Sequence, residues 1–186
     1  MKFAAATLVA ALFAAGVQAA PAKCKPDEGL KANAVLTPDL AFNATKVGGT
    51  VSLTQTAGAT TVHVSLSGLA PGLHGFHVHT GSAVSLDGFL NCTAAGSHYN
   101  PFNQTHGGLT DAVRHVGDLG NVLVGADGLV TVDISTTLNL SGATSVIGRT
   151  FVVHSGEDDL GKTDNPLSKT TGNSGKRVAC GAIVAA

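Results

Sequence analysis

The chain has 186 residues, of which 44% are hydrophobic and only 12% are charged, and its formal net charge is −1. This composition excludes a charge-rich disordered protein, and the charge argues against a polyanion-binding protein. Aromatic residues make up 4% of the chain and Trp is absent, so a base-stacking platform and a nucleic-acid partner are not expected.

The first nineteen residues have the pattern of a secretory signal peptide. Met1-Lys2 is a short positive start, the run from Phe3 to Val17 has no charge, and Val17-Gln18-Ala19 is a small-x-small cleavage site. The apolar run is short for a membrane span, which needs about 20 residues. We therefore expect cleavage after Ala19 or Ala20, a secreted domain over residues 20–186, and no membrane association.

Secretion places three cysteines, Cys24, Cys92 and Cys180, in an oxidising compartment. One disulfide and one remaining thiol are expected, and at this point the pairing stays open. Four N-glycosylation sequons agree with a secreted glycoprotein; they begin at Asn43, Asn91, Asn103 and Asn139. Asn91 is the least suitable acceptor because it adjoins a cysteine.

Short extended segments predict strands throughout the mature chain. In chain order they are Ala32–Leu36, Thr50–Gln55, Thr60–Leu66, Gly75–His79, Val130–Ile134, Ile147–Val153 and Val178–Val184. The second and third alternate with period two around a turn-rich Ala-Gly-Ala, which predicts a hairpin. No helical period follows the signal peptide, so the sequence predicts one all-β antiparallel sandwich or barrel of about eight strands.

Two long polar segments interrupt the strands, Thr80–Asn121 and Ser155–Lys176. Compact domains seldom contain structureless loops of this length unless the loops are functional. Six of the eight histidines group with them. The two long loops are therefore where we expect the chemistry.

The histidine spacing indicates one or two metal sites. His77 and His79 lie two apart on a predicted strand, so both can face one metal, although two exposed polar residues would show the same spacing. His98, His106 and His115 are followed by Asp118. Three imidazoles with one carboxylate suit Zn²⁺, whereas an all-imidazole set suits copper as well as zinc. The partner of His154, which ends a later strand, does not follow from spacing.

Several longer sequence motifs resemble those of a known family. They are Gly72-Leu73-His74-Gly75-Phe76-His77-Val78-His79, Ala95-Gly96-Ser97-His98-Tyr99-Asn100-Pro101, His106-Gly107-Gly108, Arg114-His115-Val116-Gly117-Asp118-Leu119-Gly120-Asn121, Ile147-Gly148-Arg149-Thr150 with Val152-Val153-His154, Asp158-Asp159-Leu160-Gly161-Lys162, and Thr171-Gly172-Asn173 with Arg177-Val178-Ala179-Cys180-Gly181. In this order and over nearly the whole mature chain, the sequence resembles copper-zinc superoxide dismutase.

The resemblance implies an eight-stranded antiparallel Greek-key β-barrel with two long functional loops. It implies two ligand sets: copper at His77, His79, His98 and His154, and zinc at His98, His106, His115 and Asp118. His98 is then shared between the metals. Asp158 would link copper ligand His77 to zinc ligand His106 through hydrogen bonds, and such outer partners fix ring orientation.

The resemblance also implies a Cys92–Cys180 disulfide and a cationic Arg177 beside the copper. The implied activity is dismutation of superoxide to dioxygen and hydrogen peroxide, by alternate reduction and oxidation of bound copper, as an extracellular antioxidant defence. His98 and Arg177 would be the catalytic residues, and Zn²⁺ would hold the shared histidine in place. A homodimer is expected, because Ile147-Gly148 and the last strand match positions that the family uses in dimers.

Some features depart from the family pattern. An insertion at Ala83-Val84-Ser85-Leu86-Asp87 has no assigned role, and Pro166 and Leu167 stand where many relatives have an acidic pair. Cys24 has no family role. His74 matches a structural histidine, and His63 matches nothing functional.

The alternative hypothesis is a secreted protein that sequesters copper and zinc without catalytic duty. Arg177 argues against it, because a metal buffer needs no cation to dock an anion.

Overall fold

The computed structural model describes residues 29–39, 46–83 and 90–186. The predicted signal peptide, Cys24, the Asn43 sequon and insertion residues 84–87 lie outside the described residues. Within the described ranges, no helix is long and apolar enough to cross a membrane.

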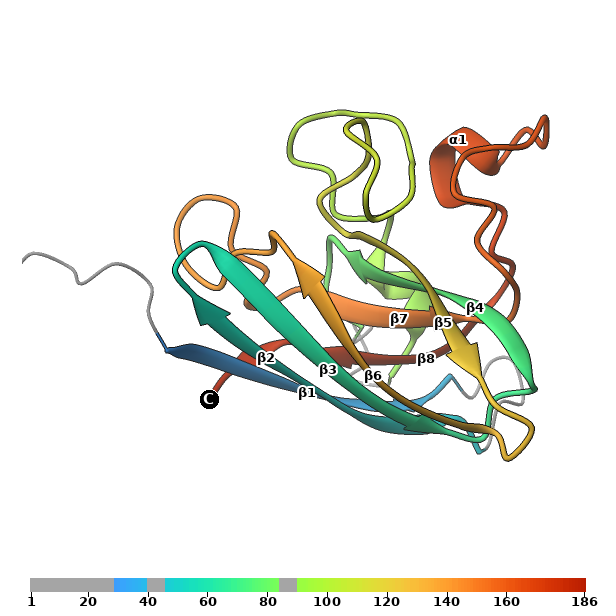
Figure 1. Cartoon of the computed structure of the whole chain (residues 1–186), viewed down its shortest axis with the longest axis horizontal. Helices are drawn as coiled ribbons and strands as arrows, with labels where there is room; N and C mark the ends of the chain where they lie inside the picture. Colours follow the sequence, from blue (N-terminus) through green and yellow to red (C-terminus); the bar gives the residue numbers. More distant parts are fainter. Residues whose placement is uncertain (1–28, 40–45, 84–89) are drawn as a thin grey trace, which may run out of the picture.

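Eight main antiparallel strands dominate the described part of the chain (Figure 1). Their bounds are β1 Leu30–Pro38, β2 Gly48–Thr56, β3 Ala59–Ser67, β4 Gly72–His79, β5 Asp118–Val124, β6 Leu129–Thr136, β7 Thr150–His154 and β8 Arg177–Ala182. A two-residue strand β9 (Val184–Ala185) pairs with β1. Among the described residues, helix is confined to the 3-10 turn η2 (Cys92–Ala95) and the four-residue α1 (Ser168–Thr171). The all-β prediction is confirmed.

One strand was missing from the sequence prediction, which placed its beginning in the first long loop. β5 opens with Asp118-Leu119-Gly120-Asn121, and residues of this kind have low strand propensity. Its pairing partner decides its conformation instead, because β5 runs antiparallel beside β4. The strand expected from Ile147 starts only at Thr150, after a turn in which Gly148 has a φ of 81°.

The strand order explains how distant parts of the chain meet. Neighbouring strands follow the order β5-β4-β7-β8-β1-β2-β3-β6, and the end strands β5 and β6 are joined by the turn at 125–128, so the barrel is nearly closed. The order places β4 beside β7, with Phe76 opposite Val153 and His79 opposite Thr150. Segments separated by about 75 residues therefore share one surface.

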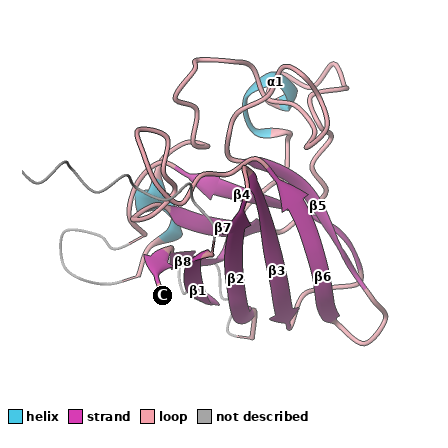
Figure 2. Ribbon diagram, turned by 60° about the vertical axis from the view of Figure 1, so that its left-hand side comes forward, coloured by secondary structure: helices cyan, strands magenta, loops and turns pink. Residues whose placement is uncertain are grey.

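The two faces of β4 have different partners. Phe76 and Val78 point into the hydrophobic core, where the rings of Phe76 and Phe151 stack 5.1 Å apart. Because side chains alternate along a strand, His77 and His79 point to the outer face. Both histidines are nevertheless buried, since the two long loops rise over the same side of the barrel (Figure 2). The outer face of β4 and β7 is thus a second, polar interior.

Candidate metal centre

The first of two buried histidine clusters joins strands β4 and β7 to the first long loop. Its members are His77, His79, His98 and His154, whose nearest ligand atoms all lie within 4.8 Å of one another. The Nε2 atoms of His79 and His154 are 3.4 Å apart, and the rings of His77 and His98 have centroids 4.0 Å apart. The strand register fixes three of these rings, and the bridge between His79 and His98 brings in the fourth.

The second cluster lies within the first loop and at the start of β5. It consists of His98, His106, His115 and Asp118, again with ligand atoms within 4.8 Å. Asp118 Oδ1 lies 2.8 Å from His98 Nδ1 and 3.1 Å from His115 Nδ1. Its Oδ2 lies 3.1 Å from His106 Nδ1. His98 therefore belongs to both clusters and offers them different nitrogens.

Asp158 connects the two clusters from behind. Its Oδ2 accepts a hydrogen bond from His77 Nε2, and its Oδ1 accepts one from His106 Nε2, each at 2.8 Å. The Asn121 side chain holds the Asp158 backbone, accepting from its N–H at 2.7 Å and donating to its C=O at 2.9 Å. Gly172 lies so close that a Cβ there would collide with both Asp158 Oδ1 and His106 Nε2.

Asn121 and Gly172 are functional positions that the sequence analysis quoted without giving them a role. Both lie in motifs that carry the family resemblance, and those motifs were the only sequence feature that could have pointed to them. Neither residue is itself a metal ligand in the family pattern. Only the folded structure shows that both support Asp158.

The unpaired nitrogens test whether the clusters suit metal ions. His77 Nδ1 and His98 Nε2 are buried and have no hydrogen-bond partner among the described residues. Leaving a buried polar atom unpaired costs about 1–3 kcal/mol. In each of these rings the other nitrogen is engaged by Asp158 or Asp118, so the unpaired nitrogen is the one turned toward a cluster. Imidazole lone pairs of this kind fit copper and zinc.

The ring protonation differs between the clusters. Burial, followed by the charges of neighbouring rings, lowers the pKa of His77, His79 and His98, and it lowers that of His154 to about 3. These four rings are therefore neutral at pH 7. His106 behaves differently: burial opposes its charge, but the carboxylates of Asp118 and Asp158 raise its pKa to about 9. Despite burial, hydrogen bonds from the three rings hold the pKa of Asp118 well below its usual range.

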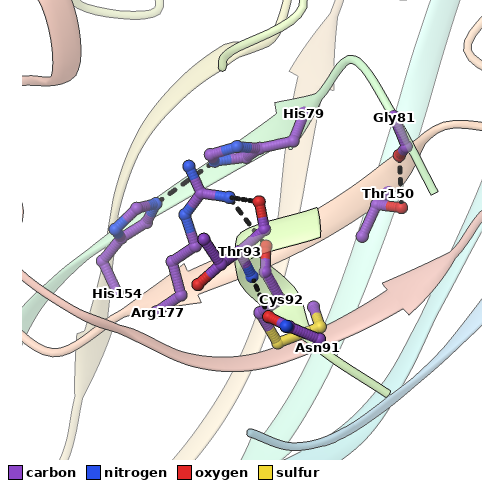
Figure 3. The surroundings of a disulfide bond; sticks show 9 residues. His79, Gly81, Asn91, Cys92, Thr93, Thr150, His154 and Arg177 are labelled. Carbon is purple, nitrogen blue, oxygen red and sulfur yellow. Dashed lines mark hydrogen bonds between the residues drawn. A yellow bond between two sulfur atoms is a disulfide. The ribbon is translucent and has the colours of Figure 1, made fainter. Parts of the chain in front are cut away.

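Arg177 lies at the start of β8 and is held against the loop that follows the first cysteine. Its guanidinium donates to the carbonyls of Cys92 at 2.7 Å and Thr93 at 3.3 Å (Figure 3), and to Gly96 O. The Gly96 carbonyl also accepts from His79 Nδ1 at 2.8 Å. Three of the five guanidinium N–H groups are thus used within the described structure, which leaves two for another acceptor.

The predicted disulfide is confirmed. Cys92 and Cys180 are bonded across a separation of 88 residues, and both are fully buried. The bond ties η2 to β8, so the carbonyls that hold Arg177 are fixed to the strand that carries it.

The structure also places the remaining histidines. The His74 ring nitrogens lie 2.9 Å from the carbonyls of His154 and Ala70, which fits a structural role. His63 pairs with Asp133 on the exposed surface of β3 and β6, away from both clusters.

Fold and site together define a β-barrel with two adjoining buried clusters that could each hold a metal ion and that share one histidine, an arrangement expected of a metalloprotein. Comparison with known proteins agrees: residues 47–183 match the family described as copper/zinc superoxide dismutase (SODC). The chain is also 48% identical over 141 residues to a protein of Brugia pahangi named extracellular superoxide dismutase (Cu-Zn), covering 74% of this chain and 69% of that protein. The chain therefore belongs to the copper/zinc superoxide dismutase family, whose cofactors are copper and zinc and whose reaction is superoxide dismutation.

Proposed function

We propose that the cluster of His77, His79, His98 and His154 holds copper and that the cluster of His98, His106, His115 and Asp118 holds zinc. The carboxylate supports this division, because the set that contains Asp118 is a closed, four-ligand site of the kind that zinc occupies. The all-histidine set suits a redox-active copper. When bound, copper supplies the one-electron oxidation and reduction of superoxide, and zinc is redox-silent.

The shared ring carries the mechanistic argument. His98 is anchored through Nδ1 beside Asp118, while its buried Nε2 has no hydrogen-bond partner in the part of the chain that the structure describes. Nε2 can therefore take up a proton without the ring losing its position. The first superoxide would give up one electron and leave as dioxygen. The second would take that electron with two protons, one from His98 Nε2 and one from solvent, and leave as hydrogen peroxide.

Arg177 is proposed to dock the anion. Its position beside His79 is fixed by three carbonyl contacts, and its remaining N–H groups can donate to superoxide oxygen. A fixed cation beside the copper cluster compensates for the negative charge of the mature chain.

We further propose that the protein works outside the cell. The signal-peptide pattern at residues 1–19, the buried disulfide and the similarity to an extracellular relative support secretion. A homodimer through the Ile147-Gly148 turn and the last strands would place exposed Val184 in an interface. Light scattering of the purified protein tests the dimer, and N-terminal sequencing of secreted protein tests the cleavage site.

The deciding experiment combines elemental analysis with a superoxide-consumption assay on copper- and zinc-supplied protein. We expect one copper and one zinc per chain, and turnover that disappears when copper alone is removed. Full metal binding without turnover would instead support the metal-sequestering alternative. One equivalent of total metal at saturation would contradict two sites that share His98.

A further inference from the structure

We propose that Asn103 carries an N-linked glycan whose first sugars rest on the exposed ring of Phe102. The modification follows from three features of the first long loop: an unengaged acceptor amide, a rigid turn beneath it, and an aromatic-lined hollow beside it. The proposal rests on entry into the secretory pathway, which belongs to the proposed function.

The described sequons differ in how far the fold engages the acceptor side chain. In Asn139, Nδ2 donates to Thr144 Oγ1 at 2.9 Å and the side chain is half-buried. Asn91 caps η2 by accepting from the Thr93 N–H, and the next residue is the buried Cys92. Asn103 is exposed, and its side chain makes no hydrogen bond within the described structure. Of these three, Asn103 can bear a bulky group in the folded state without losing an internal contact.

The turn below Asn103 is held by its own hydrogen bonds. Asn100 brackets it, donating from Nδ2 to Gln104 O at 2.8 Å and accepting from Gln104 N–H at 2.9 Å. Asn103 has a φ of 51°, a left-handed conformation that Asn tolerates better than most residues. The acceptor is therefore presented to solvent on a fixed turn.

The residue before the acceptor supplies an apolar surface. The Phe102 side chain is 62% exposed, which leaves a large aromatic face without protein cover. Phe102 and Gln104, on either side of Asn103, line a surface hollow of about 520 Å³ together with Asp111, Ala112, Arg114, Val116 and Thr137. The C–H face of an N-acetylglucosamine fits against an aromatic ring, and polar groups around it can meet the sugar hydroxyls.

The reaction is the ordinary transfer from a lipid-linked oligosaccharide diphosphate. A bond forms between Asn103 Nδ2 and C1 of the first sugar, the bond from C1 to the diphosphate oxygen breaks, and the amide nitrogen loses one proton. The Thr105 hydroxyl completes the sequon.

The test is glycopeptide mapping of the full chain secreted from a eukaryotic host. Enzymatic deglycosylation in ¹⁸O-water marks each occupied Asn as labelled Asp. We expect the label at Asn103, loss of that glycan in Asn103→Gln and Thr105→Ala, and its retention in Thr105→Ser and in the control Asn139→Gln. An unchanged glycan mass in Asn103→Gln would overturn the site.

A second measurement tests the role of Phe102. Deglycosylation of the unsubstituted protein is expected to lower its melting temperature by about 2–4 °C, the shift that a modest packing contact produces in a chain of this size. Phe102→Ala keeps the sequon but is expected to abolish this difference; an equal shift in both proteins would refute the packing. If the protein were retained inside the cell, the secretory part of the proposed function would be contradicted. Glycopeptide mapping of the retained protein would still show whether Asn103 carries a glycan.

Discussion

Replacing Arg177 with Ala tests whether this side chain guides the substrate or only braces the loop. The geometry gives weight to both roles, because within the described ranges the guanidinium donates to three carbonyls and has two further N–H groups to offer. A unit charge about 5 Å from an anion in a partly desolvated cleft contributes about 1–3 kcal/mol. We therefore expect the bimolecular rate with superoxide to fall roughly ten- to a hundredfold.

The assay is a superoxide-decay measurement over a salt series, with copper and zinc content checked in every sample. The rate of the unsubstituted protein is expected to fall with ionic strength, because screening acts over about 10 Å at 0.1 M salt. Arg177→Ala is expected to show a shallower dependence.

The matched control is Arg177→Lys, which keeps the charge but lacks the planar fork for the Cys92 and Gly96 carbonyls. Anion guidance predicts that the Lys variant keeps most of the salt dependence. The opposite result would be an equal loss of activity and an equal drop in melting temperature in the Lys and Ala variants, with both metals bound. In that case Arg177 does not guide the anion and only braces the loop.

Three further predictions concern the disulfide, the Asp158 bridge and the zinc cluster. Removing the Cys92–Cys180 bond with a double Ser variant is expected to destabilise the protein by up to about 4–5 kcal/mol, the entropy of an 88-residue loop; unchanged denaturant midpoints would refute this. Gly172→Ala is expected to displace Asp158 and lower zinc affinity about 10–100-fold, and competition with a chelator that shows equal affinity would exclude that role. The raised pKa of His106, about 9, keeps the metal-free ring protonated at pH 7.5, so zinc binding is expected to release about one proton. Calorimetry in buffers of different ionisation enthalpy measures that release, and heats independent of the buffer would contradict it.

The sequence predicted the fold well where side chains alternate. In β2 and β3 every second residue faces the core, so the pattern and the hairpin follow from period two. It failed for β5, whose opening residues form a strand only because β4 lies beside them. In β4 and β7 buried and exposed residues do not alternate, because both faces of these strands are buried.

The residue types of the site could be predicted from the sequence, but their arrangement in space could not. Spacing within the chain grouped His98, His106, His115 and Asp118, and the structure brings these residues together. Spacing could not connect His154 to His77 and His79, because their proximity arises from the pairing of β4 with β7. The family resemblance supplied that link. Nothing in the local sequence indicated that Gly172 leaves room for Asp158.

The strand order also has a consequence for the order of events in folding. The hairpin of β2 and β3 needs only a tight turn, whereas β4 pairs with a distant β7 and β1 pairs with β8 across most of the chain. Such long-range pairings form slowly, because loop-closure entropy must be overcome before the contacts stabilise the chain. The cluster of His77, His79, His98 and His154 needs the β4–β7 pairing, so it is incomplete until β7 lies beside β4. On the proposed assignment, copper can therefore meet all four of its ligands only after β7 has paired with β4.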